Sequence, residues 1–354
     1  MSESRSEFFD SYKPRIDPVR GMPGKVSPDD LLTHVFQRTG AAETDETILQ
    51  GPAEGEDAAA IDWPDGEGTL VVSSDPISLA ASQVGQLGIA VATNDIAVSG
   101  ADPRWLTAVV LLPTGVNTDV LEEISRDLDA AARELGASIV GGHSEYVDQL
   151  ERPLLSLTAM GATERYVPTG GAEPGDAVIL TKAAGIEGSA ILAADFGDDL
   201  DIDPAVRERA AGYLEEISVV PEAQIVREYA TAMHDPTEGG VTSGLLEVAR
   251  ASGVRLEIDC DDVPVREATA TLCAAAGVDP LRIFGSGALL ATVPEDVLDS
   301  CLSDLEDAGI EAAAIGTVGA LESDDPELVL DSESITGPIE DELYPLWEQA
   351  DREG

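Results

Sequence analysis

Several apolar runs with the character of β-strands end in short motifs of Asp, Gly, Asn and His, and this pattern recurs along the chain. The run 70–74 leads directly into Asp75, and the run 138–140 leads into two glycines followed by His143. Such motifs can bring polar side chains from distant parts of a chain to neighbouring strand ends. Further motifs of this kind occupy 55–58, 94–97, 100–103 and 234–240.

Strand-like and helical segments alternate between these motifs. Helical spacing of apolar residues is clear at 84–98 and at 120–135, and Asn117 is a favourable N-cap for the second of these. The alternation predicts a mixed fold of the α/β or α+β class. The expected strands are 58–62, 69–74, 105–112, 138–140, 154–162 and 177–181, and the expected helices are 27–38, 84–98, 120–135, 189–196, 204–217, 221–233 and 240–251.

A length of 354 residues suggests two domains of ordinary size. The best boundary is 168–175, a short segment rich in Pro and Gly that has no periodicity. We therefore expect a first domain at 25–167 and a second at 176–330. The ends are expected to be a flexible arm at 1–24 and an acidic tail at 331–354.

The chain carries 69 acidic residues against 20 basic ones, which gives a formal net charge of -49. Repulsion among these charges destabilises a compact state in dilute buffer. Molar salt shortens the Debye length to about 3 Å and so removes most of this repulsion. Because the acids are spread along amphipathic segments, we interpret the charge as adaptation to a salt-rich cytoplasm, with binding of basic partners as the alternative. The lack of a basic stripe argues against nucleic-acid binding.

Two further features indicate a cytoplasmic protein. Residues 1–10 are polar and acidic and lack the apolar core of a signal peptide, and no run of about 18 apolar residues predicts a membrane span.

The three cysteines, Cys260, Cys273 and Cys301, have no CxxC spacing. An odd number of cysteines without a signal peptide is typical of free thiols in a reducing compartment.

Four Asp residues stand out from the many acidic side chains because of their neighbours. Asp57 and Asp75 border strand-like runs, Asp235 lies between His and Pro in the motif 234–240, and Asp95 interrupts an otherwise apolar helical segment. A charge in an apolar segment is costly unless it is paired or bound to metal. Mg²⁺ takes oxygen ligands and needs one or two carboxylates. Two or more of these residues are therefore predicted to hold Mg²⁺ against a polyphosphate, and four carboxylates suggest a second ion or indirect roles.

Three basic residues are also candidates for this site. His143 follows two glycines at a strand end, where it is either a site residue or an ordinary turn histidine. Lys182 ends the strand 177–181 and begins a Gly-rich turn, which suits binding of a phosphate or a carboxylate. Lys25 lies where a mobile arm could fold over a bound nucleotide.

The motif 234–240 is expected to open a helix. Thr237 is placed to act as its N-cap, and the bare backbone amides that follow could receive an anion. The alternative is a cap with a structural role only.

In this order the motifs 55–58, 94–97, 100–103 and 234–240 resemble the aminoimidazole ribonucleotide synthase-like (PurM-like) superfamily. Its members include selenophosphate synthetase, thiamine-monophosphate kinase and a hydrogenase maturation protein that dehydrates a carbamoylated cysteine. The resemblance covers roughly residues 20 to 320 and is closest to the hydrogenase-maturation branch.

The resemblance implies an AIR synthase-like fold of two α/β domains, in which the N-terminal domains of two subunits pair into a β-barrel. It further implies an enzyme that uses ATP and Mg²⁺ to activate a substrate oxygen by phosphoryl transfer, on a small molecule or a protein thiol. The metal ligands would be Asp57, Asp75, Asp95 and Asp235. The implied catalytic residues are Asp235, His143 and Lys182, and the implied nucleotide-binding residues are Lys25, Asn94, Gly141, Gly142, Thr237 and Gly239.

The chain departs from the branches of this superfamily at several positions. No cysteine follows Cys301, whereas the hydrogenase protein ends in the cysteine that carries the carbamoyl group, and Glu238 stands where that branch usually has Arg. No cysteine precedes Cys260, unlike in selenophosphate synthetase. Two other functions are therefore kept as alternatives: a non-catalytic nucleotide-binding regulator and an acidic scaffold with the same fold.

Overall fold

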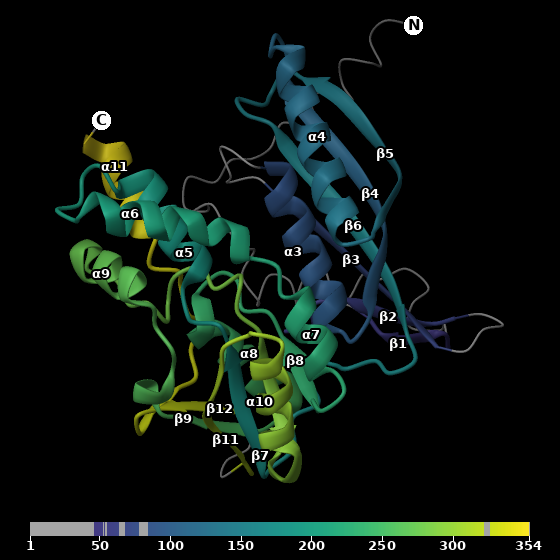
Figure 1. Ribbon diagram of the computed structural model, residues 1–354, viewed down its shortest axis with the longest axis vertical. Helices are drawn as coiled ribbons and strands as arrows, with labels where there is room; N and C mark the ends of the chain where they lie inside the picture. The colour runs from purple at the N-terminus through teal and green to yellow at the C-terminus, as the bar shows by residue number, and fades with distance from the viewer. Residues whose placement is uncertain are drawn as a thin grey trace, which may run out of the picture.

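The computed structural model describes residues 46–51, 53, 55–63, 68–77, 84–321 and 326–353. The expected N-terminal arm, the expected helix at 27–38 and Lys25 lie outside these residues. The described chain forms two sheets with helices packed on them, one sheet for each half of the sequence (Figure 1). This architecture confirms the prediction of a two-domain fold with mixed α/β structure.

The first domain is a six-stranded sheet with the strand order β1-β2-β3-β6-β4-β5. All neighbouring strands are antiparallel except β4 and β5, which run parallel and are joined through α4. Helices α3 and α4 lie on one face of this sheet (Figure 1). The elements are β1 (Ile48–Gln50), β2 (Ala59–Asp62), β3 (Thr69–Ile77), α3 (Val84–Val98), β4 (Asp102–Pro113), α4 (Thr118–Glu134), β5 (Ser138–Val147) and β6 (Leu154–Thr163).

The second domain is a seven-stranded sheet with the strand order β13-β12-β9-β11-β7-β10-β8. Its strands are β7 (Asp176–Thr181), β8 (Ala232–His234), β9 (Arg255–Ile258), β10 (Leu290–Pro294), β11 (Ala312–Gly319), β12 (Glu327–Leu330) and β13 (Glu333–Ile335). Its α-helices are α5 (Ile186–Ile191), α6 (Pro204–Ala211), α7 (Val220–Val226), α8 (Gly240–Ser252), α9 (Glu267–Ala276), α10 (Leu298–Asp307) and α11 (Tyr344–Glu353). A π-helix (Leu192–Phe196) and 3₁₀ turns (Gly212–Glu216, Cys260–Asp262 and Glu295–Val297) complete it.

Most of the expected elements are confirmed, including α3 with the expected bounds and α4 with Asn117 as its N-cap. The helix expected at 221–233 is wrong, because α7 ends at Val226 and residues 232–234 form β8. These three residues are buried and pair with β10, so tertiary strand pairing overrides the local helical pattern. In the described part of the chain, no helix combines the length and the apolar character needed to cross a bilayer.

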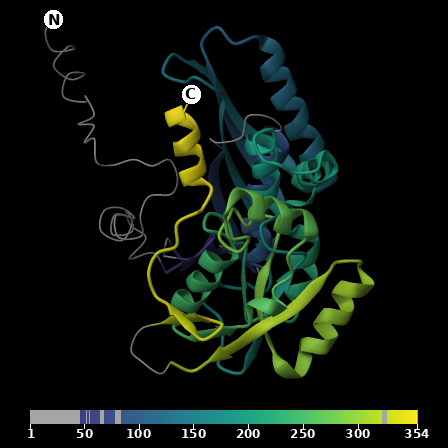
Figure 2. The same cartoon turned by 90° about the vertical axis from the view of Figure 1, so that its left-hand side faces the viewer.

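The C-terminal segment runs from β13 along one side of the molecule to α11 (Figure 2). Helix α11 is held by aromatic contacts of Tyr344 and Trp347 with Phe284, and by a hydrogen bond of 2.9 Å from Trp347 Nε1 to Asp195. The segment that was expected to be an acidic tail therefore contains a strand and a packed helix within residues 331–353.

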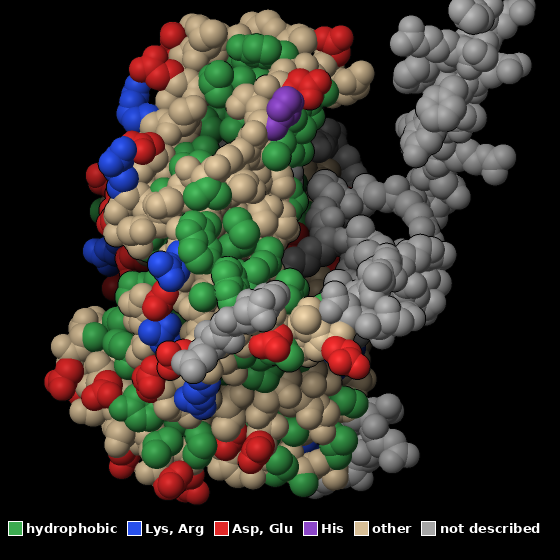
Figure 3. Space-filling model, turned by 90° about the vertical axis from the view of Figure 1, so that its right-hand side faces the viewer, with side chains coloured by type: hydrophobic (Ala, Val, Ile, Leu, Met, Phe, Trp, Pro, Cys, Tyr) green, Lys and Arg blue, Asp and Glu red, His purple; other side chains and the backbone are tan. Residues whose placement is uncertain are grey.

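The face of the first sheet opposite α3 and α4 carries apolar side chains that no described helix covers. Strands β3, β4 and β6 alternate between buried side chains, which pack on α3 and α4, and half-buried ones on the other face. Hydrophobic side chains gather on the side of the molecule where β5 lies (Figure 3). The half-buried apolar set on this face includes Leu70, Val72, Val109, Leu111 and Met160. At the sheet edge, β5 has the exposed apolar side chain of Val140, whereas its exposed Ile139 and Tyr146 pair with residues of the helix-covered face.

The first domain contacts the second at the segment 216–222, which precedes and begins α7. The buried side chain of Asn94, on α3, donates to the Ile217 carbonyl at 3.0 Å and accepts from the Val219 amide at 2.9 Å. Within the second domain, Lys182 donates to two carbonyls of the same segment and pairs with the Glu222 carboxylate at 2.8 Å. This double attachment fixes α3 relative to the second sheet.

The glycine pair in β5 allows a direct test of this packing. A Cβ at Gly142, where φ is +152°, would lie 2.0 Å from the Ala108 carbonyl oxygen, whereas a Cβ at Gly141 would have its nearest neighbour at 3.8 Å. We expect Gly142→Ala to lower the free energy of unfolding by about 2 kcal/mol or more and Gly141→Ala to change it by about 0.5 kcal/mol or less. Urea unfolding in molar KCl measures both, and equal effects would contradict the observed β4–β5 spacing.

Candidate functional site

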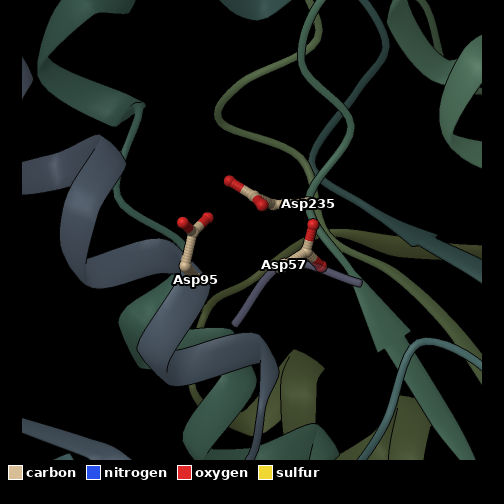
Figure 4. A group of neighbouring side chains, drawn as sticks. All are labelled: Asp57, Asp95 and Asp235. Atoms are coloured by element: carbon tan, nitrogen blue, oxygen red, sulfur yellow. The ribbon is translucent and has the colours of Figure 1, made fainter. Parts of the chain in front are cut away.

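Three carboxylates converge between the two domains. Asp57 lies in the loop before β2, Asp95 lies in the last turn of α3, and Asp235 directly follows β8. One oxygen of each lies within 4.8 Å of the others, and the side chains of Asp95 and Asp235 are 9% and 2% exposed. Asp95 projects from the helix toward the other two, which face it from the opposite side (Figure 4).

Asp75 extends this group through a serine. The Ser73 hydroxyl lies 2.5 Å from an Asp95 oxygen and 3.2 Å from an Asp75 oxygen. Because a hydroxyl has a single proton, Ser73 can donate to one of these two carboxylates at a time. The structure therefore brings together the four Asp residues singled out in the sequence, three of them directly and Asp75 as a neighbour.

The electrostatics of Asp95 indicate that this group suits a cation. Burial raises the pKa of Asp95 well above its usual value, and the neighbouring carboxylates of Asp235, Asp75 and Asp57 raise it further. A bound divalent cation reverses this effect, because its charge favours the ionised carboxylates. Carboxylate oxygens in this number fit Mg²⁺, which fills its remaining octahedral positions with water or phosphate oxygens.

His234 is a buried residue of the site that the sequence reasoning did not assign to it. Its Nδ1 lies 2.7 Å from Asp57 Oδ2, and its Nε2 lies 2.8 Å from Glu247 Oε2. Burial alone lowers the pKa of His234, but the charges and hydrogen bonds of Asp57 and Glu247 outweigh this and raise it well above its usual value. The signal in the sequence was its position beside Asp235 at a strand end; nothing in the sequence pointed to Glu247.

The side chains of Asn94 and Lys182 are both engaged by the segment 216–222, Asn94 across the domain junction and Lys182 within the second domain. Both polar atoms of the Asn94 amide bind backbone groups of the segment 216–222, although Asn94 is adjacent to Asp95. The Lys182 ammonium faces two carbonyl oxygens and the Glu222 carboxylate, which together match its three donors. In this structure Asn94 connects the two domains and Lys182 anchors the segment that Asn94 binds, and neither belongs to the carboxylate group.

His143, Gly141 and Gly142 lie in β5, at the edge of the first sheet. The His143 side chain is exposed, and its Nε2 lies 3.4 Å from Glu145 Oε2. The structure places these residues on the exposed strand, apart from the carboxylate group of the same chain.

The N-terminus of α8 receives a carboxylate of the same chain. The helix N-cap is Gly239, with φ at +77°, so the expectation that Thr237 is the N-cap was wrong. The Thr237 carbonyl instead accepts from the amides of Gly240 and Gly285, which closes the turn before the helix. The Gly239 amide donates to Asp341 Oδ2 at 2.9 Å, so Asp341 takes the position at which an anion was expected.

Asp341 is buried among other acidic groups. Its pKa is raised to about 7, mainly by burial and in part by the charges of Glu238 and Glu187, while hydrogen bonds from the amides of Leu343 and Gly239 partly offset the rise. A carboxyl that binds its proton more tightly when folded stabilises the fold at low pH, and this contribution is lost as the pH rises to about 7.

Asp341→Asn tests this titration, because Asn resembles the protonated acid. We expect the wild type to lose stability relative to Asp341→Asn as the pH rises from about 5 to about 8. Thermal unfolding at several pH values in molar KCl measures the difference, with Asp307→Asn on the exposed face of α10 as the control. A difference that does not change with pH would contradict the proton uptake assigned to Asp341.

Comparison with known proteins gives matches over both halves of the chain. The model of the AIR synthase related protein N-terminal domain matches residues 55–163, and that of the C-terminal domain matches residues 173–328. A carbamoyl dehydratase HypE from Rhizobium leguminosarum bv. viciae is 31% identical, with 90% of this chain and 91% of the relative covered. The HypE of Cupriavidus necator is 30% identical, with 86% of each chain covered.

Solved structures share the fold. A HypE–HypF complex matches with a TM-score of 0.70 at 23% identity, covering 87% of this chain and 99% of the other. AaThiL complexed with AMPPCP and TMP matches with a TM-score of 0.70 at 20% identity, covering 89% and 98%. Hydrogenase maturation protein HypE in complex with ATP matches with a TM-score of 0.66 at 23% identity, covering 89% and 96%.

Proposed function

The chain belongs to the AIR synthase-related protein family, and from this premise we propose that it is an enzyme that uses ATP and Mg²⁺ to activate a substrate oxygen by phosphoryl transfer. The observation that carries the proposal is the convergence of Asp57, Asp95 and Asp235 from two domains. Three carboxylates so close together repel one another strongly unless a cation lies between them. Clustered carboxylates around a hard cation are typical of sites that bind polyphosphates.

The residues of the chain have distinct roles in this proposal. Asp57, Asp95 and Asp235 hold the cation, and Ser73 and Asp75 orient Asp95. When bound, Mg²⁺ supplies positive charge that neutralises the phosphate oxygens. Phosphoryl transfer depends mainly on positioning and charge neutralisation, so it needs no protein nucleophile.

Similar proteins support the nucleotide and a partner. HypE has been solved with ATP, and AaThiL has been solved with AMPPCP and TMP. HypE has also been solved together with HypF, which supports a protein partner for this chain. We propose as the substrate a small molecule, or an oxygen-containing group carried on a protein thiol, in hydrogenase maturation or a related process.

Replacing single ligands tests the site. We expect Asp235→Asn and Asp95→Asn each to weaken Mg²⁺-dependent ATP binding by about 100-fold or more, because each removes a cation ligand from a buried cluster. Isothermal titration calorimetry in molar KCl measures this, with Asp129→Asn on α4 as the control. Unchanged ATP affinity in both site variants would refute the assignment of these ligands. ATP binding by the wild type without turnover of any substrate would favour a regulator over an enzyme.

We also propose that the chain forms a homodimer through the open face of the first sheet. This face carries the half-buried apolar residues named above, and β5 at its edge has the apolar side chain of Val140, which is 58% exposed. Exposed apolar surfaces of this kind are typical of protein interfaces. A second copy presents the same surface, so pairing of the two faces would cover both.

A charge in the middle of this face should prevent pairing. We expect the wild type to have twice the mass of a single chain in molar KCl, and Val109→Lys to shift it to the monomer, because a buried unpaired Lys disfavours the interface. Leu321→Lys, at an exposed apolar position outside the sheet, should stay dimeric. Size-exclusion chromatography with light scattering decides this, and a monomeric wild type would contradict the dimer.

A further inference from the structure

His234 lies between two carboxylates from opposite sides of the domain junction. Asp57 belongs to the first domain, while His234 ends β8 and Glu247 lies on α8 in the second. The ring is 3% exposed, and its two nitrogens lie 2.7 and 2.8 Å from oxygens of Asp57 and Glu247. An ionised carboxylate only accepts hydrogen bonds, so both ring nitrogens have an acceptor to which they can donate.

The surrounding chain is shaped to keep the imidazole in this place. Gly244 lies inside α8, where Gly is less favourable than Ala by about 1 kcal/mol. A Cβ there would lie 2.8 Å from Pro236 Cβ and 3.3 Å from His234 Cδ2. Gly55, with φ at +82°, brings the loop of Asp57 against the Glu247 backbone, where a Cβ would lie 3.1 Å from the carbonyl oxygen. These glycines permit the close approach of three segments around the ring.

We propose that His234 is a positioning residue of the metal site. Its Nδ1–H holds Asp57 Oδ2, so that Oδ1 of the same carboxylate is directed to the cation, and Glu247 fixes the ring through Nε2–H. The Thr169 hydroxyl donates to the same Asp57 oxygen at 3.3 Å and supports this orientation. The role presupposes the magnesium site proposed above.

A purely catalytic role fits the geometry less well. A histidine that exchanges protons with a substrate must reach it, whereas this ring is enclosed and both of its nitrogens are engaged by protein carboxylates. Hydrogen bonds from a second layer of residues orient metal ligands, and their loss weakens metal binding by roughly 10- to 100-fold. His234 has the position and the donors for that function.

Two amide substitutions separate the two ring nitrogens. The amide of Asn reaches approximately the position of Nδ1, and that of Gln reaches the position of Nε2. His234→Asn therefore keeps a donor to Asp57, and His234→Gln keeps a donor to Glu247 while losing the one to Asp57. We expect His234→Gln to weaken Mn²⁺ binding by roughly 10-fold or more and His234→Asn to stay within about threefold of the wild type.

Mn²⁺ binding to the full chain in molar KCl is measured by electron paramagnetic resonance of the free ion, after thermal unfolding has shown that both variants are folded. Equal Mn²⁺ affinities of the two variants, whether both reduced or both unchanged, would overturn the role of Nδ1. No Mn²⁺ binding by the wild type would instead overturn the metal site of the proposed function, so the two failures are distinct.

If neither variant folds, the wild type labelled with ¹⁵N-histidine replaces them. The chain has only three histidines, which makes assignment practicable. We expect an Nδ1–H resonance of His234 that shifts when Mg²⁺ is added, because its acceptor Asp57 then also binds the cation. An Nδ1 without a proton, or a resonance that does not respond to Mg²⁺, would overturn the proposal.

Discussion

Repulsion among buried carboxylates is the constraint around which this molecule is organised. Asp57, Asp95 and Asp235 approach one another within 4.8 Å, and the pKa of Asp95 is raised by burial and by its acidic neighbours. Without a cation, the fold must hold these groups against their mutual repulsion. A divalent ion turns the same arrangement into an attractive one, so the stability of the site and its ligand are linked.

The contacts between the domains serve this arrangement. Asp95 comes from the first domain and Asp235 from the second, so their separation depends on how the domains pack. Asn94 fixes α3 to the segment 216–222, and Lys182 fixes the same segment to the end of β7. His234 adds a direct ionic contact with Asp57 across the junction. Asn94, which was expected to bind nucleotide, thus contributes by fixing the two domains relative to each other.

The sequence predicted the parts of the molecule that depend on local pattern. The apolar periodicity of 84–98 gave α3, and an Asp in such a helix indicated a buried charge with a partner. The sequence could not show which side chains meet across long separations. His234 and Asp57 are 177 residues apart, and the Asp341 carboxylate reaches Gly239 across 102 residues. The strand β8 was missed for the same reason, because its pairing with β10 is a tertiary contact.

Diffraction from crystals grown with Mn²⁺ would show directly whether the three carboxylates bind a divalent cation. Mn²⁺ takes the oxygen ligands of Mg²⁺ and gives an anomalous signal that marks its position. We expect an anomalous peak between Asp57, Asp95 and Asp235, about 2.0–2.3 Å from an oxygen of each. A map with no peak among these three carboxylates, or with Mn²⁺ bound only on the outer acidic surface, would contradict it.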